Sequence, residues 1–120
     1  MAMIKRDYRK LTKIAAEAVD DKKAEDVLIL DVRQESDIAD YMVIAGAQSS
    51  TQLTALSKTV QDTFHELGVK ALHREGHAKD RWLALDYGGL VVHILLTPAR
   101  SFYRLENLWE NAKSVKWNSK

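Results

Sequence analysis

Three short apolar runs constrain most strongly what this chain can fold into. They occupy residues 27–30, 41–45 and 90–96, and each is rich in residues that favour strands. Apolar runs of about four to eight residues are typical of strands buried in a sheet, and a membrane-spanning helix needs ~20. The chain is therefore predicted to fold around a buried β-sheet.

Apolar residues at helical spacing predict three helices around this sheet. The first covers about residues 7–24. The second follows the capping residues Ser49 and Ser50 and ends before Gly68, since glycine is favoured just after a helix. Its apolar stripe consists of Leu53, Leu56, Val60, Phe64 and Leu67. The third opens with Thr-Pro at residues 97–98, a cap followed by proline at the first helical position, and fades beyond residue 112.

Two further strands complete the predicted sheet. Residues 70–75 alternate weakly between polar and apolar, and residues 81–87 alternate more strongly. Glycines 88 and 89 then form a hairpin turn into the last apolar run. The expected order is α-β-β-α-β-β-β-α. It predicts an α/β fold with a single mixed five-stranded sheet and packed helices, in one domain over residues 1–120 with a core of about 7–112.

The composition narrows the class of protein. With 120 residues, 46% of them hydrophobic, one domain is expected, and the absence of Cys excludes disulfides, thiolate metal sites and Cys nucleophiles. Neither a signal peptide nor a membrane span is visible, so we expect a cytoplasmic protein with no membrane partner. The formal net charge is only +1, and basic residues gather at the two ends, so direct RNA contact is expected to be peripheral at most.

A turn from Gly46 to Ser50 is the first candidate for chemistry. It follows a buried strand and opens a helix, a place where N–H groups can hold an anion. The turn matches neither a dinucleotide fingerprint nor a Walker A loop, so Ser49 or Ser50 could simply cap the helix. A nucleotide-binding or nucleotidyltransferase-like enzyme is therefore the alternative function. Against it, Asp31-Val32-Arg33 places a cation where a metal-binding carboxylate pair needs its second acid.

The histidines are weaker candidates. His73, Glu75 and His77 offer the right atoms for zinc, but Gly76 and the surrounding alternation indicate strand and turn, whereas this spacing binds zinc on a helix. We therefore expect neither a metal nor another cofactor. His93 alternates with apolar neighbours and is interpreted as a hydrogen-bonded core histidine, not as a catalytic base.

The strand over residues 81–87 offers an interaction surface. Its period of two places Leu83, Leu85 and Tyr87 under the helices and Trp82, Ala84 and Asp86 on the opposite face, which is open if the helices cover one side. An exposed Trp beside a carboxylate is typical of an interface hot spot. The alternative is that Trp82 folds over its own sheet or is covered by the C-terminal tail.

Several motifs, taken in order, resemble one known family. They are residues 40–46 (DYMVIAG) with the serines at 49–50, Glu75-Gly76, residues 82–88 (WLALDYG), residues 91–93 (VVH) and residues 100–109 (RSFYRLENLW). Together they resemble the ribosomal silencing factor family, also called Iojap-like, from about Leu11 to Ala112. Their combination is specific, although no single motif is.

The resemblance implies a translational repressor without enzymatic activity. Such a protein binds the large ribosomal subunit through ribosomal protein fourteen of that subunit and sterically blocks joining of the small subunit. The implied fold has a nucleotidyltransferase-like topology. The implied partner-binding face consists of Trp82, Ala84, Asp86, Tyr87, Arg100, Tyr103 and Glu106. The same aromatic face could also pair with itself, so a homodimer is a further expectation.

Overall fold

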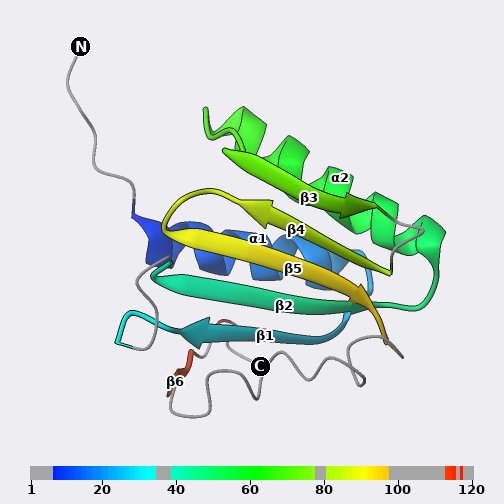
Figure 1. Cartoon of the computed structure of the whole chain (residues 1–120), viewed down its shortest axis with the longest axis horizontal. Coiled ribbons are helices and arrows are strands. Elements are labelled where there is room, and N and C mark those ends of the chain that lie inside the picture. The colour runs from blue at the N-terminus through cyan, green and yellow to red at the C-terminus, as the bar shows by residue number, and fades with distance from the viewer. Residues whose placement is uncertain (1–6, 35–38, 78–80, 98–112, 116, 118–120) are drawn as a thin grey trace.

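The computed structural model describes residues 7–34, 39–77, 81–97, 113–115 and 117. The described elements are α1 (Tyr8–Asp21), β1 (Glu25–Asp31), β2 (Tyr41–Ala47), α2 (Ser50–Glu66), β3 (His73–His77), β4 (Trp82–Asp86), β5 (Leu90–Leu96) and β6 (Lys113–Ser114). Figure 1 shows them as a layer of helices against one sheet. The predicted mixed α/β class is confirmed. The predicted third helix, over about residues 97–112, falls almost entirely outside the described residues.

The sheet has six strands in the order β3-β4-β5-β2-β1-β6. β2 and β5 are parallel, whereas the other neighbouring strands pair antiparallel. A parallel pair needs a crossover, and here α2, β3 and β4 lie between the two strands in sequence. The predicted mixed sheet and the hairpin from β4 to β5 are therefore confirmed. The predicted count of five strands was one short, because β6 has only two residues and carries no periodic signal.

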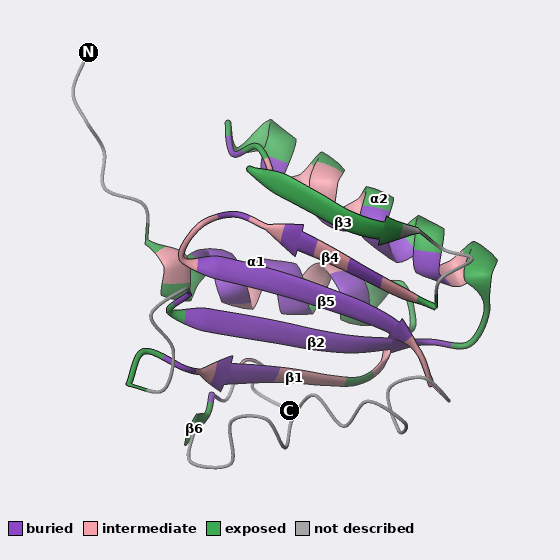
Figure 2. Ribbon diagram, viewed as in Figure 1, coloured by how far each residue is buried: buried purple, intermediate pink, exposed green. Residues whose placement is uncertain are grey.

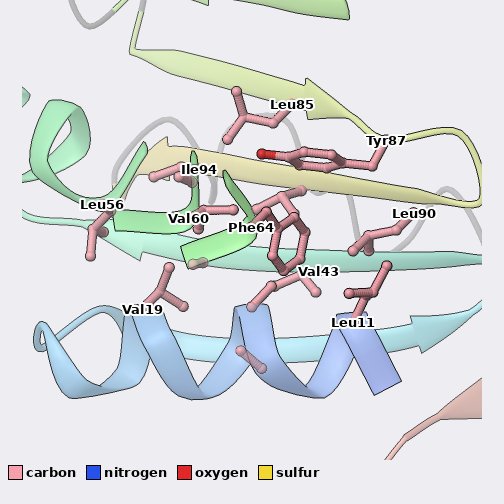
Figure 3. Close-up of a cluster of buried hydrophobic side chains, with 14 of the residues drawn as sticks. Leu11, Val19, Val43, Leu56, Val60, Phe64, Leu85, Tyr87, Leu90 and Ile94 are labelled. Atoms are coloured by element: carbon pink, nitrogen blue, oxygen red, sulfur yellow. The ribbon is translucent and has the colours of Figure 1, made fainter. Parts of the chain in front are cut away.

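The two described helices pack on the same face of the sheet and enclose the main core (Figure 3). Its two largest fully buried side chains are Phe64 of α2 and Tyr87, which directly follows β4, and their rings meet edge to face with centroids 4.7 Å apart. α2 ends at Glu66, so Leu67 is its C-cap and is 53% exposed, although the helical stripe predicted it to be buried. Gly68 follows with a φ of +76°, the left-handed conformation expected just after a helix.

The face opposite the helices is only partly open. A second cluster of buried residues lies on it, drawn from β1, β2, β5 and the turn after β1: Leu30, Val32, Met42, Ile44 and Leu95. All seven residues of β2 are consequently buried, as Figure 2 shows along the middle of the sheet. The expectation that this whole face is open was therefore wrong, and its accessible part lies along β3 and β4.

Within the described part of the chain, no helix has both the length and the apolar character required to cross a membrane.

Candidate functional site

On the second face, a row of side chains crosses three strands. It comprises accessible residues of β3 and β4 and a buried residue of β5 beside them. We call it the open face and define it as Glu75 of β3, Trp82, Ala84 and Asp86 of β4, and His93 of β5. The strand register places Ala84 between Glu75 on one side and His93 on the other. Glu75 is exposed, the three β4 residues are half-buried, and His93 is buried. Figure 2 shows the change from exposed β3 to buried β5.

Trp82 lies against its own sheet, although part of its surface remains accessible. Its indole Nε1 donates a hydrogen bond to Nδ1 of His93 at 3.0 Å, and the two ring centroids are 5.7 Å apart. The side chain also packs beside the second cluster of buried residues. The sequence left two interpretations of Trp82, an exposed side chain or one that folds over its own sheet. The structure contains the second, with the side chain half-buried.

His93 is the buried member of the open face. Its side chain lies in an apolar environment with 8% of its surface exposed, and burial lowers its pKa to about 4. The imidazole is therefore neutral at neutral pH. Because Nδ1 accepts the indole proton, the imidazole proton is on Nε2, which is buried and finds no hydrogen-bond partner among the described residues. The prediction of a hydrogen-bonded core histidine is confirmed.

Asp86 has a structural contact as well as an accessible carboxylate. Its Oδ1 accepts a hydrogen bond from the backbone N–H of Gly88 at 2.8 Å, which closes the turn between β4 and β5. Gly88 has a φ of +94°, a conformation that few residues other than glycine adopt. The carboxylate is thereby held at the end of the open face and adds negative charge beside that of Glu75.

Tyr87 does not belong to the open face. It follows Asp86 and points to the helix side, where its side chain is only 1% exposed and packs on Phe64 (Figure 3). Burial raises the pKa of its hydroxyl to about 12. Its inclusion among the partner-binding residues is therefore corrected, because the alternation along β4 that exposes Trp82 also buries Tyr87. The other three residues implied by the resemblance, Arg100, Tyr103 and Glu106, lie outside the described residues.

The turn predicted from Gly46 to Ser50 is shorter in the structure, because β2 runs to Ala47 and α2 begins at Ser50. Its groups are bonded within the chain itself. Ser49 is the N-cap of α2, and its side chain accepts a hydrogen bond from the N–H of Gln52 at 3.1 Å. The N–H of Gln48 donates to the side chain of Gln52 at 2.7 Å. Two N–H groups that could hold an anion are thus already bonded, which confirms the interpretation of the serine as a helix cap.

A carboxylate also lies beside this turn. Glu25 of β1 accepts hydrogen bonds from the hydroxyl of Thr97 and from the side-chain amide of Gln48. These bonds, that from Thr97 foremost, lower the pKa of Glu25, so the group is anionic at neutral pH. A phosphate approaching the turn would therefore meet a negative charge, which weighs against a nucleotide site here.

Replacing the cap tests this structural role. Ser49→Ala should lower the free energy of unfolding by ~1 kcal/mol, because the N–H of Gln52 loses its acceptor. Chemical denaturation followed by circular dichroism measures the change. The matched control is Ser50→Ala at the first, exposed residue of α2, which should change stability little. Equal losses in the two variants would contradict the assignment of Ser49 as the cap.

Arg33, which occupies the position where a metal-binding carboxylate pair would need its second acid, forms an ion pair with Asp31 in the structure. Arg33 donates to both carboxylate oxygens of Asp31, at 3.0 and 2.8 Å, and lowers the pKa of that carboxyl. Residues 73–77 form a strand, not the helix that zinc binding at this spacing requires. The strand was predicted over residues 70–75, so Gly76 and His77 lie in the strand and not in the predicted turn. Among the described residues, no three acidic, His or Cys side chains are arranged to hold a metal ion.

Comparison with known proteins gives consistent matches along the chain. The family model described as "ribosomal silencing factor during starvation" matches residues 5–120. Ribosomal silencing factor RsfS of Bacillus subtilis is 40% identical over 106 residues, which cover 88% of this chain and 90% of that protein. The chloroplastic protein Iojap of Zea mays is 34% identical over 103 residues, covering 83% of this chain and 43% of the maize protein.

A solved structure is similar as well. The crystal structure of a Chromobacterium violaceum protein superposes with a TM-score of 0.84 at 33% sequence identity, and the match covers 90% of each chain.

Proposed function

The chain belongs to the ribosomal silencing factor family, which gives it a ribosome-associated role in regulating translation, and we propose that it exerts this role by steric occlusion. In this proposal it binds the large ribosomal subunit through ribosomal protein fourteen of that subunit and keeps the small subunit from joining. We further propose that it acts in the cytoplasm. The open face is the proposed docking surface.

The observation that supports this surface most directly is the ordered tryptophan on it. Trp82 is half-buried and hydrogen-bonded to His93, so its accessible surface is offered in one orientation. A held aromatic side chain loses little conformational entropy on binding, and Trp is enriched at hot spots. Ala84 beside it is small, which leaves room for a side chain of the partner to pack against the indole.

The charge of the open face favours a protein partner over RNA. The open face carries two carboxylates, Glu75 on β3 and Asp86 on β4, and the formal net charge of the chain is only +1. Phosphates would be repelled by these carboxylates, whereas a ribosomal protein that binds RNA is basic and offers Lys or Arg side chains. RNA contact is proposed to be peripheral at most. Arg100, Tyr103 and Glu106 extend the proposed face on the resemblance alone.

A steric mechanism needs no reaction at the docking surface. The chain measures 43 × 32 × 31 Å along its principal axes. A folded body of this size on the subunit-facing side of the large subunit takes up space that the small subunit needs when the two halves join. Binding to ribosomal protein fourteen, together with the size of the domain, is then sufficient to keep the small subunit from joining.

Self-association through the open face is less well supported. A two-fold contact would bring together two copies of a surface that carries Glu75 and Asp86, so their like charges would face a shared interface. A basic partner neutralises these charges instead. The nucleotide-binding alternative has no observation in its favour, since the turn from Gly46 to Ser50 is bonded internally.

Co-sedimentation with separated ribosomal subunits tests the proposal. The purified chain should pellet with the large subunit and stay in the supernatant with the small one. When added before the subunits are mixed, it should lower the fraction of joined ribosomes on a sucrose gradient. Binding to the small subunit alone, or unchanged joining at saturating protein, would contradict steric occlusion.

A further inference from the structure

His93 stands at a position where an aliphatic residue would stabilise the fold better. Its neighbours along β5, Val92 and Ile94, are fully buried, and His93 itself is only 8% exposed. Its Nε2 carries a proton that reaches no acceptor in the part of the chain that the structure describes, and a buried polar group without a partner destabilises the folded state. Packing alone therefore does not account for a histidine here.

Within the described residues, the His93 side chain makes one hydrogen bond, and it goes to the open face. Nδ1 accepts the indole N–H of Trp82 at 3.0 Å, and the ring planes are tilted by 54°. Residues 82 and 93 are on adjacent antiparallel strands but are not direct partners, because Trp82 lies opposite Leu95 and Ala84 opposite His93. The indole therefore reaches diagonally from β4 to the imidazole on β5.

We propose that His93 is a positioning residue, which holds the indole of Trp82 in the orientation that the binding partner meets. This inference rests on the proposed function, in which the open face is the docking surface. Without the acceptor, the indole can turn about its two side-chain torsions and direct its N–H toward solvent. The partner then has to select one orientation from several, and binding weakens without the loss of any direct contact.

Neutrality of the imidazole suits this role. An acceptor needs the lone pair on Nδ1, and a protonated imidazole has none. Burial lowers the pKa of His93 to about 4, so the lone pair is available at physiological pH. The burial of His93 that destabilises the fold thus also keeps its imidazole neutral, so that Nδ1 can accept the hydrogen bond.

Two substitutions separate positioning from packing. His93→Leu removes the acceptor and the unpaired Nε2 proton together, so its melting temperature should equal or exceed that of the natural chain. Its affinity for isolated large ribosomal subunits should nevertheless fall roughly three- to tenfold, the range expected for one lost hydrogen bond. His93→Asn places an amide oxygen near the position of Nδ1 and should restore most of the affinity.

The indole signal provides a readout that does not depend on the ribosome. In the free protein, the Nε1 proton of Trp82 should exchange slowly with solvent and shift in the nuclear magnetic resonance spectrum of His93→Leu. The chain has three tryptophans, so Trp82→Phe assigns the resonance. In the Trp82→Phe background, which has no N–H donor, His93→Leu should not weaken binding further.

The outcomes distinguish this inference from the proposed function. If Trp82→Ala weakens binding but His93→Leu binds like the natural chain, the positioning role is overturned and the docking surface stands. If melting temperature and affinity fall together in His93→Leu and asparagine restores neither, His93 is a packing residue only. If Trp82→Ala binds normally, the docking surface fails and the positioning role fails with it, even if the indole resonance shifts.

Discussion

Replacing Trp82 with alanine is expected to weaken binding to the large ribosomal subunit by at least about thirtyfold, which corresponds to ~2 kcal/mol. The indole is the largest side chain of the open face, and its accessible part is held by the hydrogen bond to His93. Its removal takes away the apolar contact at the centre of the proposed interface. Titration of labelled protein against isolated large subunits measures the change.

Trp117 provides a matched control for this substitution. It is also half-buried and also hydrogen-bonded through its indole, to the carbonyl of Val27 at 3.3 Å, but it packs against the core on the helix side. Trp117→Ala should therefore cost some stability and leave subunit binding close to normal. Equal losses of binding in both variants would point to general destabilisation.

A second substitution tests the same surface without removing any packing. Ala84→Arg adds bulk and positive charge in the middle of the open face, between Glu75 and His93 in the register. A basic partner would be repelled and obstructed, so binding should fall while the circular dichroism spectrum stays unchanged. If Trp82→Ala and Ala84→Arg both fold and both bind normally, the open face is not the docking surface.

The fold was largely predictable because its signals are local. Mostly apolar runs of strand length marked β1, β2 and β5, and alternation marked β4. The cap at Ser49 and the left-handed Gly68 delimit α2 in the structure as they do in the sequence. Each of these signals depends on a few neighbouring residues, so each can be read without knowing the tertiary structure.

The remaining features depend on contacts between distant segments. β6 exists because Lys113 and Ser114 pair with the end of β1, and two residues have no period of their own. The burial of Met42 and Ile44 on the second face depends on what packs there, which the apolar run alone does not specify. Tertiary context decided these points, and the sequence pattern therefore overestimated how open the sheet is.

At the candidate site, the face of each residue was predictable but its partner was not. Alternation correctly placed Trp82, Ala84 and Asp86 opposite the helices, and the same rule should have removed Tyr87 from the interface. The bond between Trp82 and His93 was missed, although the hairpin turn at Gly88 brings their strands into antiparallel register. Reading β4 against β5 across that turn would have placed both rings on one face and two residues apart.

Acid should destabilise this protein at a pH where most carboxyl groups are still ionised. His93 has a pKa of about 4 in the folded chain, against 6.5 for an ordinary histidine. Between these two values the unfolded chain binds a proton that the folded chain does not, so stability falls as the pH drops from 6.5 toward 4. Above pH 6.5, the ionisation of His93 has no effect on the stability of the fold.

The expected loss is about 2 kcal/mol between pH 7 and pH 5 and about 3 kcal/mol once the pH is below 4. Glu25 and Asp31 have lowered pKa values, so their contributions are lost only as the pH falls below the ordinary values of 4.5 and 3.8. Urea denaturation at pH 7, 6 and 5 therefore isolates the histidine. His93→Leu should lose the dependence, whereas His65→Gln, on the exposed side of α2, should retain it. An unchanged slope in His93→Leu would mean that another group takes up the proton, and that His93 is not held neutral by burial.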